Sequence, residues 1–302
     1  MEHGIGSGID PGSALRQLGV ADVIEVAPLS GGWGGTQLWR VTRSSEPSEL
    51  LLRAFPNGRP ELAEREAIAQ RLARSAGIPV PAVIGWGTIG AHGEHAALVM
   101  EWSRGQPAVH HLGQDPSRAF ETGREMGRVL ARIHAIPAPT DPAFPPAGAW
   151  IDWAGDYAGD LRLWLEAAIP SDAASRLLHL DFHIANVLIE GGSVSAVLDW
   201  ANTRPGPPIA DLARACAIVD QTAEVPGLTQ EQREALPALK RGLMEGHADV
   251  FGPPLEMALF AAWALAAMVT DLASKVGQPG VWLTANGLAR LRASCERSIA
   301  AL

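Results

Sequence analysis

The chain has 302 residues, of which 47% are hydrophobic and 19% are charged. This composition is typical of a globular protein and excludes a disordered one, and the length favours two lobes over a single simple core. The formal net charge of −9 argues against a nucleic-acid partner, because phosphate backbones require clustered Lys and Arg side chains.

A cytoplasmic location is expected from the distribution of apolar residues. Residues 1–20 contain glycines, Asp10 and Pro11 but no apolar signal core. The longest apolar run, at residues 257–270, is shorter than the roughly 20 residues that a bilayer span requires. Cys216 and Cys295 show no metal or redox spacing, which favours free thiols in a reducing compartment. We expect no membrane partner and take a monomer as the default.

The first hundred residues predict a small β-rich lobe. Apolar runs with β-branched residues predict strands at residues 23–29, 36–42, 50–55, 83–84 and 96–100. A helical pattern at residues 61–76 stands between the third and fourth of these strands and ends at Gly77. The lobe is therefore expected to be one sheet with one helix.

Helical patterns dominate the rest of the chain. Helices are expected at residues 117–134, 157–169, 209–220, 229–250, 255–276 and 287–300. Thr229 is the expected N-cap of its helix, which Pro237 can kink or split. We expect an α+β fold of two lobes, residues 1–102 and 103–302, with a hinge near residues 100–105 and a ligand cleft between the lobes.

The most informative stretch is His179-Leu180-Asp181-Phe182-His183-Ile184-Ala185-Asn186, which we call the candidate catalytic loop. Asp199 follows Asn186 by thirteen residues. Phosphoryl transfer from a magnesium nucleotide needs one carboxylate to orient the attacking hydroxyl, and it needs hard oxygen ligands to hold the metal on the phosphates. Asp181 suits the first role, while Asn186 and Asp199 suit the second. The stretch therefore predicts a kinase-type reaction.

Two apolar runs after the loop predict a β hairpin. Residues 187–189 and 194–198 are rich in β-branched residues, and Glu190-Gly191-Gly192-Ser193 separates them as a turn. In a hairpin, the residue before the first strand and the residue after the second strand lie at the same edge of the two-stranded sheet. Asn186 and Asp199 are therefore expected to lie close together.

The β-rich lobe has two features that suit phosphate binding. Residues without side chains let backbone amides approach phosphate oxygens, and such a run lies between the first two strands at Ser30, Gly31, Gly32, Gly34 and Gly35. Arg53 lies on the third strand and Glu66 on the following helix. A strand cation held by a helix carboxylate is the arrangement that kinase-type sites place on the α and β phosphates.

From about Leu29 to the last helices, the chain resembles the aminoglycoside phosphotransferase-like family of small-molecule kinases, which has a protein-kinase-like bilobal fold. The resemblance implies that Asp181 is the catalytic aspartate and that Asn186 and Asp199 bind Mg²⁺. It implies that the phosphates of ATP bind to Ser30 and the glycines after it, and to Arg53, which pairs with Glu66. It also implies that Met100, Glu101 and Trp102 offer backbone groups to adenine.

Two residues depart from the family pattern. The family usually has His-Gly-Asp, whereas Leu180 stands in the middle position here. Arg53 replaces the usual Lys, and although it keeps the charge, its planar guanidinium is not interchangeable with an ammonium group. Both departures bear on nucleotide affinity. By resemblance, Asp211 braces the loop from a helix N-terminus, and we count it as structural because capping explains an Asp that opens a helix. His179 and His183 are expected to be structural, as packing histidines.

Two other functions are compatible with the same residues. His179, Asp181, His183 and Asp199 form a possible ligand set for a metal-dependent hydrolase. That function leaves the glycine run, Asn186 and the Arg53 and Glu66 pair unexplained. The departures at Leu180 and Arg53 also allow a non-catalytic nucleotide-binding protein on a kinase-like fold.

The acceptor is expected to be a hydroxyl of a small molecule, of aminoglycoside or macrolide type or a metabolite. Aromatic residues precede the loop or lie in a late helix, and they are candidates for an apolar or sugar-stacking wall, although core packing is expected for most of them. These residues are Trp150, Trp153, Tyr157, Trp164 and Trp263. An aminoglycoside pocket would gather carboxylates for the amines of its ligand. The candidates for that role are Asp152, Asp156, Asp160 and Glu166.

Overall fold

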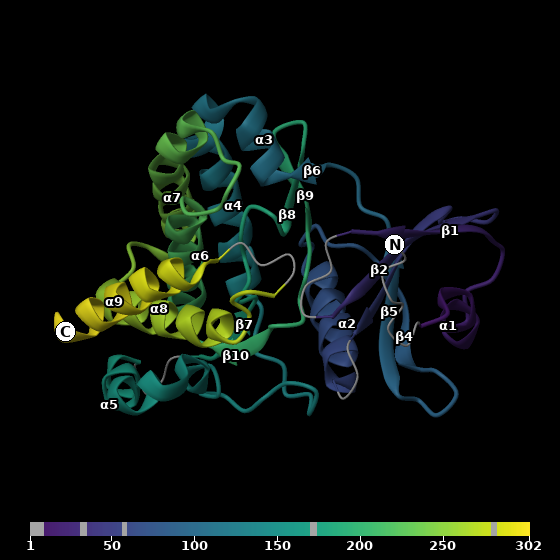
Figure 1. Ribbon diagram of the computed structural model, residues 1–302, viewed down its shortest axis with the longest axis horizontal. Coiled ribbons are helices and arrows are strands. Elements are labelled where there is room, and N and C mark those ends of the chain that lie inside the picture. Colours follow the sequence, from purple (N-terminus) through teal and green to yellow (C-terminus); the bar gives the residue numbers. More distant parts are fainter. Residues whose placement is uncertain (1–8, 31–34, 56–58, 170–173, 279–282) are drawn as a thin grey trace. The chain divides into compact units, whose positions relative to one another are not determined.

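A computed structural model of the chain describes residues 9–30, 35–55, 59–169, 174–278 and 283–302. The chain forms two compact units. Unit 1 comprises residues 1–75 and 80–103, and unit 2 comprises residues 76–79 and 104–302. Unit 1 is built on a sheet and unit 2 is largely helical (Figure 1).

Unit 1 contains an antiparallel sheet of five strands in the order β1-β2-β3-β5-β4. Its strands are β1 (Val23–Leu29), β2 (Gln37–Arg43), β3 (Glu49–Phe55), β4 (Val83–Ile89) and β5 (His95–Glu101). These are the five strands expected from the sequence, and β3 is central because its neighbours are β2 and β5. Arg53 on β3 is therefore held by pairing on both sides.

Helices α1 (Pro11–Gln17) and α2 (Pro60–Ser75) pack on opposite faces of this sheet. Side chains alternate along a strand, so Leu52 and Arg53 point to opposite faces of β3. Leu52 belongs to the apolar cluster that includes the buried residues of α1. Arg53 instead contacts Glu66 on α2. The sequence analysis predicted α2 but not α1.

Unit 2 contains most of the helices of the described chain. The longer helices are α4 (Ala119–His134), α5 (Ala158–Ala168), α6 (Pro208–Thr222), α7 (Gln230–Phe251), α8 (Met257–Ala273) and α9 (Ala285–Ala300). Each corresponds to an expected helix. Thr229 caps α7 in a capping box with Gln232, as expected, and α7 continues as one helix through Pro237.

Short elements complete unit 2, and several of them were not predicted. They are β6 (Gln106–Pro107), α3 (Ala108–Gln114), η1 (Pro116–Arg118), η2 (Ile151–Tyr157), β7 (Arg176–Leu178) and β10 (Arg204–Gly206). The predicted hairpin is confirmed as β8 (Val187–Glu190) and β9 (Ser193–Val197), with β6 added at the edge of β8. Strands β7 and β8 flank the candidate catalytic loop.

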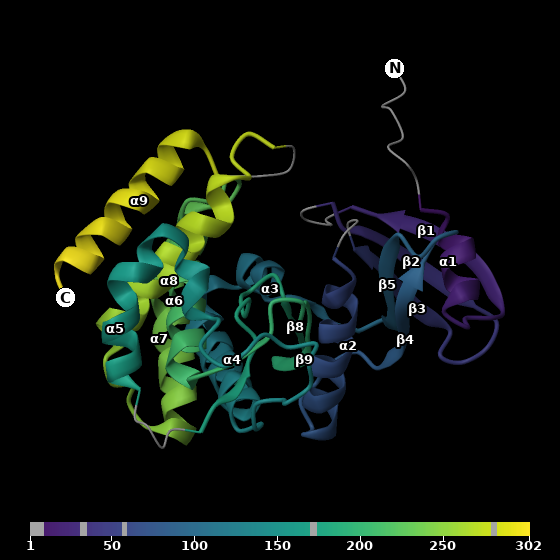
Figure 2. The same ribbon diagram turned by 90° about the horizontal axis from the view of Figure 1, so that it is seen from below.

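Helices α4 and α7 lie side by side in both ribbon views (Figures 1 and 2). Four glycines allow their backbones to touch. A Cβ on Gly123 or Gly127 would lie 2.0 or 2.2 Å from a carbonyl oxygen of α7. A Cβ on Gly242 or Gly246 would lie 2.1 or 2.0 Å from a carbonyl oxygen of α4. No larger residue fits at these four positions without separating the helices.

The core of unit 2 is centred on α8, which packs against α6, α9 and η2. Figure 2 shows α8 beside α9 and close to α5 and α6. Trp150 and Trp263 are fully buried in this core, with their rings in an edge-to-face contact at 4.9 Å. They are core residues, as expected for most of the aromatic residues, while Trp164 is 47% exposed.

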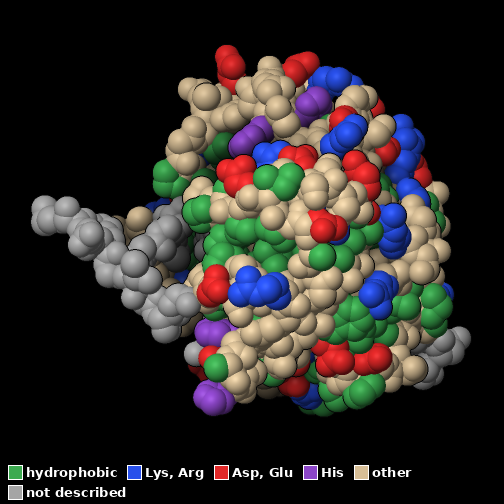
Figure 3. Space-filling view, turned by 90° about the vertical axis from the view of Figure 1, so that its right-hand side faces the viewer, with side chains coloured by type: hydrophobic (Ala, Val, Ile, Leu, Met, Phe, Trp, Pro, Cys, Tyr) green, Lys and Arg blue, Asp and Glu red, His purple; other side chains and the backbone are tan. Residues whose placement is uncertain are grey.

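Acidic and basic side chains are interspersed on the face shown in Figure 3, with apolar side chains between them. Exposed apolar residues of unit 1 include Val23 and Ile24 on β1. In the described part of the chain, no helix combines the length and the apolar character needed to cross a membrane.

Candidate active site

The candidate catalytic loop holds Asp181 and Asn186 side by side between β7 and β8. The Nδ2 of Asn186 donates to the carbonyl oxygen of Asp181 at 3.0 Å and lies 3.4 Å from its carboxylate Oδ2. Because the amide nitrogen is used in this way, the Oδ1 of Asn186 is directed elsewhere. The loop therefore presents a carboxylate and an amide oxygen from residues five apart.

His179 connects Asp181 to the segment before Asp199 through hydrogen bonds to backbone groups. Its Nδ1 accepts a hydrogen bond from the amide of Asp181 at 3.2 Å, so its Nε2 carries the proton and donates to the carbonyl oxygen of Leu198 at 3.0 Å. Burial lowers the pKa of His179, which keeps the ring neutral in this tautomer. The ring thus links the residue carrying the candidate base to the residue before Asp199.

Asp211, in the first turn of α6, braces the loop as the resemblance implied. The capping explanation is wrong, because Pro207 is the N-cap of α6 and no side chain caps this helix. Its Oδ2 accepts from the amide of His179 at 2.6 Å and its Oδ1 accepts from the amide of Leu180 at 2.9 Å. Burial alone raises the pKa of this carboxyl, but the hydrogen bond from His134 and the nearby imidazoles outweigh burial, and the pKa lies below its ordinary value. Asp211 is therefore an ionised, buried anchor.

His134 and His247 extend this anchor into the helices, and the sequence analysis missed both. The Nε2 of His134 at the end of α4 lies 3.0 Å from Oδ2 of Asp211. Its Nδ1 lies 2.9 Å from Nε2 of His247 on α7. Burial, together with the neighbouring His134, lowers the pKa of His247 to about 3. No local sequence spacing could have found this chain of groups, because it joins three helices.

Leu180 adopts a left-handed backbone conformation, with φ of 59°. A β-carbon is disfavoured in this region, which explains why glycine suits the position. The Leu180 side chain is fully buried in the unit 2 core, and its carbonyl oxygen accepts from Nε of Arg214 at 2.7 Å. Arg214 in turn contacts Asp271 on α8. The loop therefore holds a positive φ at this position without glycine.

Asn186 and Asp199 are brought together as expected. The amide of Leu198 donates to the carbonyl oxygen of Asn186 at 2.8 Å, so Asp199 directly follows a residue bonded to Asn186. One amide oxygen and one carboxylate are hard donors, and these donors suit a divalent cation such as Mg²⁺. The residues present therefore fit the metal that the resemblance implies.

The donor set of the alternative hydrolase is not assembled. Both ring nitrogens of His179 already have backbone partners, so this residue cannot bind a metal without breaking them. His183 uses Nδ1 to accept from the amide of Ala185 at 3.2 Å. Among the residues that the structure describes, no three or more His, Cys, Asp or Glu side chains form a metal-binding group.

Arg53 and Glu66 form the expected ion pair in unit 1, with Nη1 of Arg53 at 3.0 Å from Oε1 of Glu66. The Glu66 side chain is 1% exposed and also accepts from Nε2 of Gln70 at 3.2 Å. A carboxylate buried this deeply holds its cation strongly, because water does not screen the pair. The guanidinium plane also lies over the ring of Phe55 at 4.9 Å.

The remaining predicted nucleotide residues lie at two ends of the sheet. Ser30 follows β1 and is exposed, while Gly35 precedes β2 with φ of 85°. Gly31, Gly32 and Gly34 lie outside the described residues.

The predicted adenine segment ends β5. The Met100 side chain is buried, with its sulfur 3.9 Å from Nε2 of Gln70. The amides of Glu101 and Trp102 already donate to the carbonyl oxygens of Ala82 and Glu49 at 2.8 and 3.0 Å.

Solved structures of small-molecule kinases resemble this chain in fold. The amicoumacin kinase hAmiN in complex with AMP-PNP, Ca²⁺ and Ami has a TM-score of 0.70 and 14% identity, over 97% of this chain and 94% of that one. A thermostable mutant of aminoglycoside phosphotransferase APH(4)-Ia, in ternary complex with ADP and hygromycin B, has a TM-score of 0.66 and 16% identity, over 95% of this chain and 96% of that one. These likenesses confirm the predicted kinase-like α+β fold.

Two sequence comparisons address the family. The acyl-CoA dehydrogenase family member 10 of Mus musculus is 29% identical over 195 residues, which are 56% of this chain. The matched part is only 18% of that relative's length. Residues 25–246, more than half of the chain, match the phosphotransferase enzyme family. The protein therefore belongs to the phosphotransferase enzyme family, as the candidate catalytic loop predicted.

Proposed function

We propose that the protein transfers the γ-phosphoryl group of ATP to a hydroxyl group of a small molecule. The observation that supports this proposal is a hydrogen-bond network at His179, whose Nδ1 accepts from the amide of Asp181 and whose Nε2 donates to the carbonyl oxygen of Leu198. Leu198 precedes Asp199, and its own amide donates to the carbonyl oxygen of Asn186. Solved kinases of similar fold, bound to AMP-PNP or ADP together with an antibiotic, support the same reaction class.

Asp181 is proposed to orient the acceptor hydroxyl and to accept its proton as the phosphoryl group is transferred. Its carboxylate side chain is 23% exposed, so a substrate can reach it. The hydrogen bond from Asn186 to the Asp181 carbonyl restrains the backbone that carries the carboxylate. Catalysis would then rest on positioning and on stabilising charge, which is the usual division of labour in phosphoryl transfer.

Asn186 and Asp199 are proposed to hold Mg²⁺ on the nucleotide phosphates. A magnesium ion held there would neutralise charge that develops on the phosphoryl oxygens. Leu198 is fixed by His179 and by Asn186, so both proposed ligands depend on the same short network. Loss of His179 would therefore disturb the metal ligands as well as Asp181.

In unit 1, Arg53 is proposed to bind the α and β phosphates, with Glu66 holding its guanidinium. Ser30, Gly31, Gly32, Gly34 and Gly35 are proposed to cover the phosphates with backbone amides. Met100, Glu101 and Trp102 are proposed to lie beside adenine. Because the amides of Glu101 and Trp102 already have acceptors, we expect carbonyl or side-chain contacts from this segment.

The Asp181→Asn substitution tests this assignment. It removes the proton acceptor but keeps the size of the side chain, so turnover should fall by about 10²-fold or more, while ATP affinity stays close to that of the wild type. Turnover is followed by ADP release with a panel of hydroxylated acceptors, and ATP affinity by calorimetry with Mg²⁺ present.

Asp22→Asn is the matched control for that experiment. Asp22 is exposed in unit 1 and has φ of 59°, a conformation that Asn tolerates well. It should retain wild-type turnover. Full activity in Asp181→Asn would contradict the role of Asp181. Binding of Mg-ATP without phosphorylation of any acceptor would instead favour the non-catalytic nucleotide-binding protein.

A further inference from the structure

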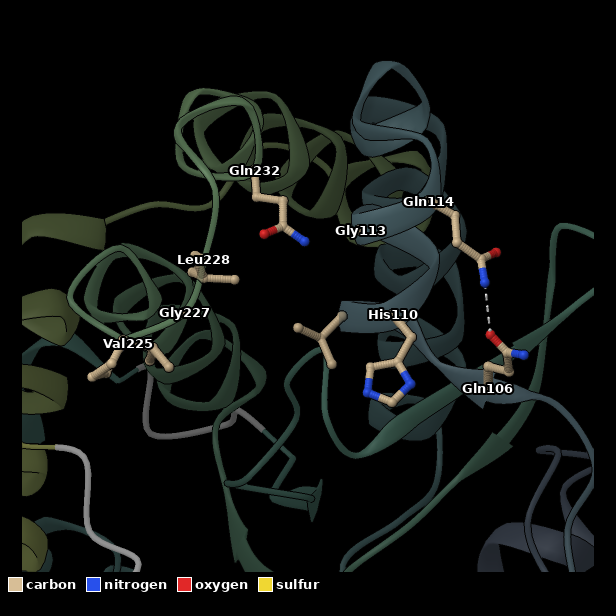
Figure 4. Close-up of a pocket in the computed structure, with 10 residues that line it drawn as sticks. Gln106, His110, Gly113, Gln114, Val225, Gly227, Leu228 and Gln232 are labelled. Atoms are coloured by element: carbon tan, nitrogen blue, oxygen red, sulfur yellow. Dashed lines mark hydrogen bonds between the residues drawn. The ribbon is translucent and has the colours of Figure 1, made fainter.

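Unit 2 contains an open cavity of about 690 Å³ between α3 and the segment that joins α6 to α7. A volume of this size accommodates a small organic molecule. Figure 4 shows Val225, Leu228 and Gln232 on one side and His110 of α3 on the other. The full lining is Gln106, Val109, His110, Gly113, Gln114, Val225, Pro226, Gly227, Leu228 and Gln232.

One wall of the cavity is bonded directly to the candidate catalytic loop. The amide of Val109, a lining residue in the first turn of α3, donates to the carbonyl oxygen of Ile184 at 3.0 Å. Ile184 lies between Asp181 and Asn186 in the sequence. A molecule in the cavity therefore rests on a helix that is fixed to the loop proposed to perform the chemistry.

The lining carries no charged side chain of the Asp, Glu, Lys or Arg type among the residues that the structure describes. Its polar groups are three glutamine amides and the imidazole of His110. A glutamine amide both donates and accepts hydrogen bonds, so it suits hydroxyl and amide groups. The apolar residues Val109, Val225 and Leu228 suit a carbon skeleton. An ammonium group in this cavity would find no carboxylate among the residues that line it.

Two of the four carboxylates that the sequence analysis offered for a polyamine, Asp152 and Glu166, are engaged elsewhere. Asp152 and Glu166 both pair with Arg162, and all three lie on the exposed surface of η2 and α5. Neither residue lines the cavity.

We propose that this cavity, named here the α3–α7 cavity, binds the phosphoryl acceptor, and that this acceptor is an uncharged molecule with hydroxyl and amide groups on an apolar body. The inference rests on the proposed function for its kinase chemistry, and it adds the substrate class. A polyamine of the aminoglycoside type does not match the lining.

Gln232 provides a substitution that changes the charge of the cavity and preserves the fold. Its Oε1 accepts from the amide of Thr229 at 2.7 Å in the capping box of α7. Its Nε2 lies 2.7 Å from the point where a Cβ on Gly113 would stand, so it reaches across the cavity to α3. Glutamate serves equally well in a capping box. Gln232→Glu therefore keeps the cap and places a carboxylate oxygen toward the cavity.

Calorimetry on the full chain with Mg-AMP-PNP present tests the proposal with two probes. Chloramphenicol is neutral and carries hydroxyl groups, an amide and an aromatic body, whereas kanamycin carries several amines. We expect the wild type to bind chloramphenicol more tightly than kanamycin. Gln232→Glu should shift the ratio of the two affinities toward kanamycin by about tenfold. The reason is that the new carboxylate can pair with an amine of kanamycin, and one such pair changes the affinity by about a factor of ten.

Gln230→Glu is the matched control, because it makes the same charge change two residues earlier in α7 and outside the lining. It should leave the ratio unchanged. Tighter binding of kanamycin to the wild type, no binding of either probe, or an equal shift in both variants would overturn the proposal. Phosphorylation is measured separately by mass spectrometry. Binding of chloramphenicol without phosphorylation of it or of any other acceptor in the panel would count against the proposed function, while the cavity would still be a binding site for uncharged molecules.

Discussion

Leu180 carries two opposing contributions to stability. Its left-handed φ of 59° costs roughly 1–2 kcal/mol for a residue with a β-carbon. Its side chain is fully buried, and truncation of a buried leucine to alanine costs about 2–5 kcal/mol. Because the second contribution is larger, leucine is tolerated at a position where the family has glycine.

This balance predicts an unusual order of stability among variants of Leu180. Leu180→Ala loses the packing and keeps the strain, whereas Leu180→Gly loses the packing and relieves the strain. Leu180→Gly should therefore be more stable than Leu180→Ala by about 1 kcal/mol, although both are less stable than the wild type. Denaturant unfolding followed by tryptophan fluorescence measures the difference. If alanine proves the more stable of the two, the backbone at this position is not strained.

The residues of the candidate site differ in how far the sequence could predict them. Asp181, Asn186 and Asp199 follow from spacing, because a short loop and a hairpin connect them. The pair of Arg53 and Glu66 follows from a strand and the next helix. His134 and His247 could not be predicted, because their partners lie far away in the sequence and are reached only after α4, α6 and α7 have packed together.

At the scale of elements, the close contact of α4 with α7 is what brings these histidines together. Gly246 immediately precedes His247, and a Cβ on it would lie 2.0 Å from the carbonyl oxygen of Arg124. Any separation of the two backbones at this point would lengthen the 2.9 Å contact between His134 and His247. The glycines therefore set the geometry of the anchor beneath the candidate catalytic loop.

Gly127→Ala should destabilise the protein. Its new methyl group would stand 2.2 Å from the carbonyl oxygen of Leu243, which is backbone and cannot turn aside. Overpacking of this kind costs about 1–3 kcal/mol and outweighs the gain of about 1 kcal/mol in helix propensity. Thermal unfolding by circular dichroism measures the change.

Gly159→Ala serves as the control for that change. Gly159 is exposed on α5, and a Cβ there meets no other atom within 4 Å. The propensity gain should then act alone and stabilise the protein by about 0.5–1 kcal/mol. Equal effects of the two substitutions would show that α4 and α7 are not in backbone contact.

The elements themselves were predictable where hydrophobic periodicity was long. The six longer helices of unit 2 and most strands of unit 1 carry enough periodic residues to be recognised. Strand β4 was expected only at residues 83–84, because Gly85 and Gly87 interrupt its apolar pattern. Helices α1 and α3 have seven residues each, too few for a clear period. Pro237 lies within α7 without ending it, because packing of that helix against α4 outweighs the local preference.

At the scale of the whole molecule, the buried histidines predict how stability depends on pH. His179 and His247 have pKa values below the ordinary 6.5, mainly because burial disfavours the charged ring. The unfolded chain binds protons below pH 6.5 while the folded chain does not, so stability falls as the pH decreases from that point. The lowered pKa of Asp211 adds a further loss as the pH falls below 3.8.

His247 alone should make the free energy of unfolding depend measurably on pH. With a folded pKa of about 3, its ring contributes a loss of about 2 kcal/mol between pH 6.5 and pH 5, at about 1.4 kcal/mol per pH unit. Urea unfolding at a series of pH values, followed by tryptophan fluorescence to which the buried Trp150 and Trp263 of unit 2 contribute, measures this slope. His247→Phe should be less stable at pH 7.5 but should show a shallower acid slope.

His92→Asn, which changes an exposed ring of unit 1, should keep the wild-type slope. An unchanged slope in His247→Phe would mean that the His247 ring takes up its proton equally in the folded and unfolded chains, and His247 would then not be a neutral, buried ring in the folded protein.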